Sequence, residues 1–155
     1  MKSFNFPLES LRTLRKQREH AAQQQYSRAL ILCDGATRTL QLAEEELKAA
    51  RVMLVDELKN GITASRIVNL RTWCSVLETR RDECTVALTK AQRSAEEAFR
   101  QMTAAVRERE ALDRFHDKSK RQWQHAVQVE EQKMFDELAV QRQSQVGLEK
   151  THVLN

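Results

Sequence analysis

The sequence contains very few residues that interrupt an α-helix. Of its 155 residues, only three are glycine and one is proline, the two residue types least favourable in a helix interior. Phosphate-binding loops also need several glycines, so little backbone is available here to form one. The composition predicts long, uninterrupted helices.

Long apolar runs are missing as well. Charged residues make up 31% of the chain and the mean hydropathy is −0.64, which leaves too little apolar material for a thick globular core. The longest apolar run covers only residues 29–33, whereas a membrane-crossing helix needs roughly 20 residues. After Lys2, the polar residues Asn5 and Glu9 interrupt any signal-like segment. We expect a cytoplasmic protein with no transmembrane segment and no cleaved signal.

Motifs for catalysis or metal binding are not found. The four histidines show no i, i+4 pairing and no Cys-x-x-Cys companion, which argues against a zinc site. Neither a G-x-x-x-x-G-K-[ST] loop nor a G-x-S-x-G sequence occurs. Cys33, Cys74 and Cys84 lie on the helical seam described next, where a free thiol packs as a small apolar group. We predict that the protein is not an enzyme and uses no cofactor or metal.

Two heptad patterns meet at Asn60-Gly61. In each, residues recur in alternating steps of three and four, which places them on one seam of a coiled-coil helix. Gly61 suits the left-handed conformation that ends a helix, and so short a connection makes the helices antiparallel. The sequence therefore predicts an all-α fold, an antiparallel two-helix coiled coil. The first series is Ala29, Cys33, Ala36, Leu40, Ala43, Leu47, Ala50 and Leu54, and the second is Ile67, Leu70, Cys74, Leu77, Arg81, Cys84, Leu88, Ala91, Ala95, Ala98, Met102, Ala105, Arg109 and Leu112.

The boundaries follow from helix-capping residues. Pro7 suits a first helical turn, and Thr63 or Ser65 can cap the second helix. We predict one coiled-coil hairpin over residues 1–155, with helix one at about 7–59, a turn at 60–62, helix two at about 63–146 and a frayed tail at 147–155.

Near the N-terminus the projected seam becomes polar. It places Arg12, Arg15 and Glu19 at inward positions, so we expect the register to shift or loosen between residues 12 and 22.

Helix two is the longer helix, and its C-terminal end forms a helical overhang. Counting from the turn places Leu8 level with residue 114, so residues after about 118 have no partner in helix one. Apolar surface that a monomer cannot bury often marks a partner; fraying is the alternative, because a lone helix is weakly stable. The apolar residues of this region are Trp123, Ala126, Val127, Val129, Met134, Phe135, Leu138 and Val140.

The charge of the chain is basic but locally uneven. The net charge is +4; residues 2–19 and 114–121 are basic, whereas residues 130–137 are mainly acidic. A nucleic-acid-binding strip would stay basic and include interleaved aromatic residues. We therefore predict no nucleic-acid partner.

Trp73 precedes the seam residue Cys74 and lies on its flank. It either widens the core stripe or forms a recognition face with Val76 and Leu77, because a rigid aromatic side chain is an efficient anchor for another protein.

Three motifs occur in order along the chain. They are Phe4-x-Phe6-x-Leu8-Glu9-x-Leu11-x-x-Leu14-Arg15, then Asn60-Gly61-Ile62-x-x-x-Arg66-x-x-Asn69 followed by Leu77-Glu78, and finally Glu131-Gln132-Lys133-x-x-Asp136-Glu137. In order, spacing and total length the chain resembles the FliJ family of flagellar type III export proteins.

The resemblance implies an antiparallel coiled coil similar to the central stalk of rotary ATPases. It implies a protein that couples the export ATPase hexamer to the cytoplasmic domain of the membrane export gate, interacts with export chaperones, and is needed for flagellum assembly and motility. The expected location is the cytoplasm, peripherally associated with the inner membrane at the flagellar base.

The resemblance also implies two surfaces. The gate-binding surface would include Trp73, Val76 and Leu77, although two family positions that are aromatic on helix one are Glu46 and Ala50 here. Basic residues would pair with acidic loops of the ATPase ring, and the acidic motif around Asp136 is the alternative contact. The basic residues are Arg12, Arg15, Arg18, Arg114, Lys118 and Arg121.

Two other functions remain open at this point. The equivalent stalk protein of a virulence type III secretion system would share the fold and the ATPase partner. A homo-oligomeric structural coiled coil would instead use the apolar overhang to pair with itself.

Overall fold

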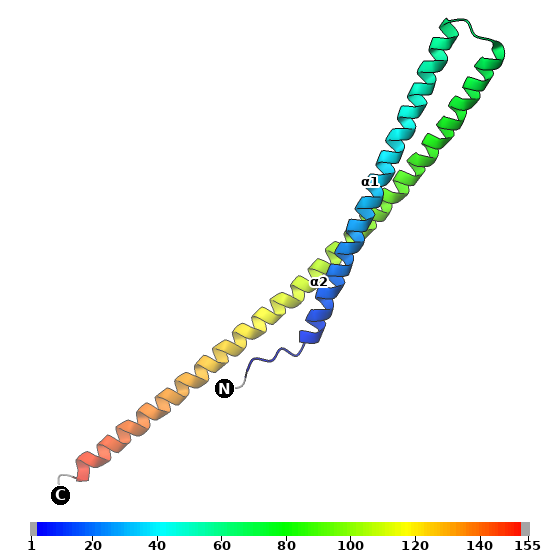
Figure 1. Cartoon of the computed structure of the whole chain (residues 1–155). Helices are drawn as coiled ribbons and strands as arrows, with labels where there is room; N and C mark the ends of the chain where they lie inside the picture. Colours follow the sequence, from blue (N-terminus) through cyan, green and yellow to red (C-terminus); the bar gives the residue numbers. More distant parts are fainter. Residues whose placement is uncertain (1–2, 153–155) are drawn as a thin grey trace. The chain divides into compact units, whose positions relative to one another are not determined.

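A computed structural model describes the backbone of residues 3–152 and the side chains of residues 3–142. It contains two α-helices, α1 at Glu9–Lys59 and α2 at Ala64–His152, joined by a short turn (Figure 1). No strand occurs in this described part of the chain. The predicted all-α helical hairpin is confirmed.

The C-terminal end of α1 is closed by local hydrogen bonds. The Asn60 N–H donates to the carbonyl oxygens of Asp56 and Glu57, at 3.2 Å each. Gly61 follows with a φ of 74°, a conformation that costs glycine little because it has no Cβ. The left-handed glycine expected at this turn is confirmed.

Thr63 occupies the N-cap position of α2. Its carbonyl oxygen accepts from the N–H groups of Arg66 and Ile67, at 3.1 Å each, as expected for the residue that precedes the first helical residue. The turn between the two helices therefore needs only four residues, 60–63.

The two helices contribute to two compact units. The hairpin unit comprises residues 15–107, and the terminal unit comprises residues 1–14 with 108–155.

In the hairpin unit, α1 and α2 pack antiparallel along the predicted seam. Every seam residue of this unit is buried or half-buried, and the most tightly packed cluster consists of Leu47, Ala50, Cys74 and Leu77. Cys33 and Cys84 are half-buried free thiols on the same seam. The apolar seam therefore provides the packing that stabilises the pair of helices. The polar residues on the flanks contribute much less to stability.

Ion pairs on the flanks fix the pairing of the two helices. Their members ascend along α1 and descend along α2, which is the antiparallel order. All are well exposed on at least one side, so each contributes about 0–1 kcal/mol and serves mainly to select the register. The pairs are Glu46 with Arg80 at 2.7 Å, Arg51 with Glu78 at 2.6 Å, and Glu57 with Arg66.

In the terminal unit, the segment before α1 packs on α2. Phe6 is only 5% exposed, with its ring centroid 5.8 Å from that of Phe115 and 4.9 Å from that of His116. Phe4 extends this contact to Trp123, at 5.8 Å. The sequence placed Trp123 in an overhang without a partner. This was wrong, because the N-terminal segment covers it.

The backbone of this segment is not helical, which also explains where α1 begins. The sequence placed the start of helix one at about residue 7, whereas Pro7 and Leu8 form a turn and the helix begins at Glu9. The Glu9 N–H donates to the Phe6 carbonyl oxygen at 3.2 Å. The chain can bring Phe4 and Phe6 onto α2 because it is not yet helical there.

The expected register shift near residues 12–22 does not occur. Arg12, Arg15 and Glu19 are half-buried at the projected seam positions, while Leu11 and Leu14 are exposed. Polar residues can hold these positions because they find partners, which for Arg12 is Asp113.

At its other end, α2 continues to His152 and not to about residue 146. One glycine costs only about 1 kcal/mol in a helix, so Gly147 does not terminate it. Of the predicted frayed tail at 147–155, residues 153–155 lie outside the described part. Side chains from 128 to 142 are all exposed, so the unpartnered part of α2 begins later than the sequence indicated.

Candidate functional site

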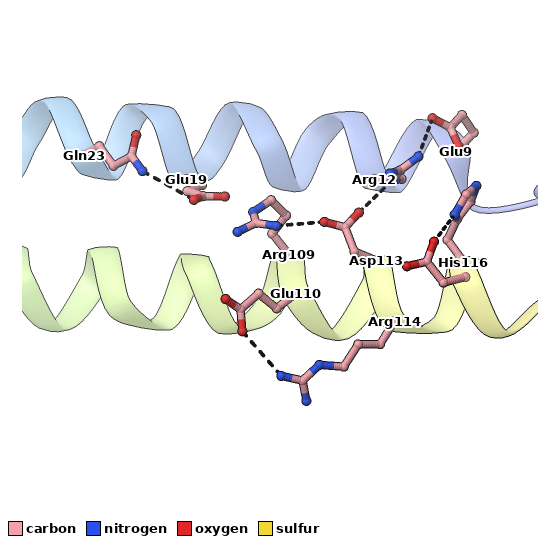
Figure 2. A network of polar contacts seen from close by, with 10 residues as sticks. Glu9, Arg12, Glu19, Gln23, Arg109, Glu110, Asp113, Arg114 and His116 are labelled. Carbon is pink, nitrogen blue, oxygen red and sulfur yellow. Dashed lines mark hydrogen bonds and ion pairs between the residues drawn. The ribbon is translucent and has the colours of Figure 1, made fainter.

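A polar cluster joins the first turn of α1 to α2 within the terminal unit (Figure 2). The Arg12 Nε–H donates to one carboxylate oxygen of Asp113 at 2.7 Å, and Arg109 donates to the other at 2.8 Å. The three side chains are 23–27% exposed. Glu9 lies 3.7 Å from the Arg12 guanidinium. Asp113 thus connects one arginine from each helix.

The charges of this cluster shift the ionisation of its members. The hydrogen bond from Arg12 lowers the pKa of Asp113, partial desolvation opposes that shift, and the hydrogen bond from Arg109 adds to it. The same bond to Asp113 raises the pKa of Arg12. Both residues are therefore held in their charged forms.

Acid is expected to weaken this junction. Because the pKa of Asp113 in the folded protein lies below its ordinary value of 3.8, its stabilising contribution is complete above that value and is lost as the pH falls through the lowered pKa. Asp113→Asn should therefore be less stable than the unmodified chain at pH 7, and their stabilities should converge as the pH falls through the lowered pKa of Asp113. The free energies of unfolding of both proteins are measured by urea titration between pH 7 and pH 2.5, with circular dichroism as the signal. Parallel stability curves across that range would contradict the assignment.

The proposed ring-binding residues differ in how free their charges are. Arg12 is already neutralised by Asp113, and Arg15 is half-buried and also has a partner within the chain. Arg18, Arg114 and Lys118 are exposed, and Arg114 has only a 3.6 Å contact with Glu110.

Arg121 completes this set of basic residues. It is exposed, and its Nε–H donates to the Asp117 carbonyl oxygen at 3.3 Å. The cations best able to meet another protein are therefore Arg18 in the hairpin unit and Arg114, Lys118 and Arg121 in the terminal unit.

The gate-binding residues predicted from the sequence do not share one surface. Trp73 and Val76 are 54% and 53% exposed, whereas Leu77 is 2% exposed. The assignment of Leu77 to a recognition face was wrong, because this residue is at a seam position and packs against Leu47 and Ala50. Trp73 and Val76 remain available on the flank.

The opposite helix contributes to the same flank. The Glu46–Arg80 ion pair lies on this side of the hairpin. Met53 follows Glu46 by seven residues on α1, and Trp73 precedes Arg80 by seven residues on α2, so both lie one heptad nearer the turn. Met53 is also half-exposed. Ala50, by contrast, is buried, so an aromatic side chain could not be placed there without displacing the core.

Sequence reasoning missed the aromatic cluster of the terminal unit. Phe4 and Phe6 meet His116 and Trp123, and both of the latter continue the seam of α2 beyond Leu112 in steps of four and seven. The extended Phe4-x-Phe6 alternation was the signal that could have identified it.

Two findings concern other kinds of site. Among the residues described, no three His, Cys, Asp or Glu side chains are grouped so as to hold a metal ion. No helix in the same part of the chain is long and apolar enough to cross a membrane.

Residues 4–147 match the family described as the flagellar FliJ protein. The chain belongs to the FliJ family. Searches of curated proteins and of solved structures each found no match. The FliJ family consists of non-enzymatic flagellar export proteins, so this protein is a coiled-coil component of flagellar export, and the match favours the flagellar over the virulence system.

Proposed function

We propose that this protein couples the flagellar export ATPase hexamer to the cytoplasmic domain of the export gate and assists export chaperones, without catalysing a reaction itself. Family membership supports a role in export. The observation that carries the gate interaction is the half-exposed Trp73 on a helix held by a buried seam. Binding to the gate would keep the protein at the inner membrane at the flagellar base, on its cytoplasmic side.

The gate-binding surface consists of Trp73, Val76 and Met53. A tryptophan fixed on a helix presents a large contact area and loses little conformational entropy on binding. Arg80 and Glu46 border these residues and are paired with each other, so the apolar surface has a polar rim, as many protein interfaces do.

The ring-binding surface consists of exposed basic residues. Arg114, Lys118 and Arg121 recur at steps of four and three on α2, which places them on one face of the helix. Charges of one sign on a face steer association with an acidic partner and increase its rate. Arg18 offers a further exposed cation on α1.

Because the two surfaces belong to different units, mutations should separate their roles. Trp73→Ala/Val76→Ala is expected to weaken binding to the isolated cytoplasmic domain of the gate at least tenfold, since truncating a central aromatic anchor costs about 2 kcal/mol or more. The same variant should stimulate ATP hydrolysis by the cognate export ATPase as well as the unmodified protein. Calorimetric titration and a steady-state ATPase assay measure these two activities.

The reciprocal variant is Arg114→Ala/Lys118→Ala. It should reduce stimulation of the ATPase, more strongly at low than at high salt, while gate binding is preserved. The proposal fails if the unmodified protein neither stimulates the ATPase nor binds the gate domain, or if each variant impairs both activities equally with an unchanged melting temperature.

A further inference from the structure

The part of α2 beyond Trp123 carries an apolar stripe along one face of the helix. Val127, Met134 and Leu138 are spaced by seven and four residues, so they lie on one face of the helix. Phe135 lies at the edge of that face. Met134, Phe135 and Leu138 are all more than half exposed, which leaves their apolar surface in water. Glu131 occupies the position between Val127 and Met134 on the same face.

This stripe continues an interface that already exists. Within the terminal unit, the seam residues His116 and Trp123 are half-buried beneath Phe4 and Phe6, and Val127 is still half-buried. Trp123 and Met134 are eleven residues apart, as are Val127 and Leu138. An eleven-residue repeat keeps apolar side chains on one side of a nearly straight helix. The stripe is therefore a helix-pairing face.

Charges beside the stripe define what can pair there. Residues 130–137 hold four acids and the single base Lys133. Glu130, Glu131 and Glu137 lie on or beside the stripe, whereas Asp136 is two residues from both Met134 and Leu138 and so on another face. In the hairpin unit, flank residues are matched by opposite charges, as in Arg51 with Glu78. By the same rule, a helix that pairs with this stripe should offer Lys or Arg at its flanks.

The acidic flanks also disfavour a second copy of this chain. If two overhangs paired antiparallel with Val127 opposite Met134, Glu130 of one copy would lie level with Glu131 of the other. Parallel pairing would place each acidic residue beside its own equivalent. Like charges in either arrangement oppose association.

We propose that residues 127–138 of α2 are a docking face for a basic amphipathic helix of another protein, which pairs with α2 through Met134 and Leu138. Methionine and phenylalanine at the centre suit such a face, because Met adapts to the partner's shape and Phe supplies area. This inference does not depend on the assignments of the ring and gate surfaces, since its test uses neither.

The test uses the full chain and two synthetic 21-residue peptides. Both have Leu at the a and d positions of three heptads; one has Lys and the other Glu at e and g. The Lys peptide should bind at least ten times more tightly than the Glu peptide, and Leu138→Glu should weaken its binding at least tenfold. Isothermal titration at 0.15 M salt measures these affinities, and hydrogen exchange should show new protection over residues 128–142.

Val140→Glu is the matched control. It adds the same single negative charge on the same helix at a 66% exposed position, but two residues from Leu138 and so on another face. It should bind the Lys peptide as well as the unmodified chain does. The proposal is overturned if the two peptides bind equally, if both variants lose binding alike, or if protection appears only outside residues 128–142. A stable homodimer in light scattering that Leu138→Glu dissociates would also overturn it, because a second copy would then occupy the face.

Discussion

Leu77→Ala is expected to lower the free energy of unfolding by about 2–4 kcal/mol, because it removes a leucine side chain from a closed cluster and leaves a cavity. Leu77 is among the least exposed residues of the described chain and packs with Leu47, Ala50 and Cys74. A two-helix structure has no second layer that could fill the gap. Urea unfolding followed by the circular dichroism of the helices measures the change.

The neighbouring residue provides the control. Val76→Ala changes a half-exposed side chain one position away and should alter stability by no more than about 0.5 kcal/mol. Similar losses for the two variants would mean that Leu77 is not a core residue. The pair therefore separates packing from recognition, which the sequence alone treated as one surface.

Phe6→Ala is expected to detach the N-terminal segment and expose Trp123. Phe6 is the buried anchor of this segment, between Phe115 and His116, and truncating a buried phenylalanine costs about 3–5 kcal/mol. Because the segment is short and lies outside both helices, it should be released as a local event while the helices remain folded. Because the chain has two tryptophans, the emission of Trp123 is measured in a Trp73→Phe background, where it should shift to longer wavelength.

Leu8→Ala is the matched control for this experiment. Leu8 is in the same segment but exposed, so its truncation should leave the emission of Trp123 unchanged. If Phe6→Ala also leaves the emission unchanged, Phe6 does not hold the segment on α2. A loss of helical circular dichroism would instead show that the segment is needed for the whole fold.

The fold was predictable because its signals are local and repeated. Heptad spacing fixes which side of each helix is apolar, and Gly61 marks the only tight connection within the described chain. These signals correctly placed Cys74, Ala50 and Leu54 on the seam. They failed for Arg12, Arg15 and Glu19, because apolar periodicity does not show that a polar residue can stay on the seam when a partner such as Asp113 lies opposite.

The candidate surfaces were less predictable than the fold. Trp73 and Leu77 are both apolar and four residues apart, so periodicity places them close together on the helix. Their exposure differs because a step of four residues turns the side-chain direction by about 40° around the helix axis. This rotation is enough to place Leu77 on the seam and Trp73 on the flank. The role of Phe4 and Phe6 depends on a non-helical segment that packs on α2, which no helical pattern can reveal.

The helices, the turn at Gly61, the antiparallel pairing and the residues of the seam could be read from the order of residues alone, because each depends on spacing along the chain or on the conformational preference of one residue. Packing was needed to show that Asp113 joins Arg12 to Arg109, that Phe4 covers Trp123, that Leu77 is buried beside an exposed Trp73, and where the free face of α2 begins. These features depend on contacts between residues as many as about 120 positions apart, such as Phe4 and Trp123, and on how side chains share a limited apolar surface. Such contacts form only when the helices pack, so they leave no repeating signal in the sequence.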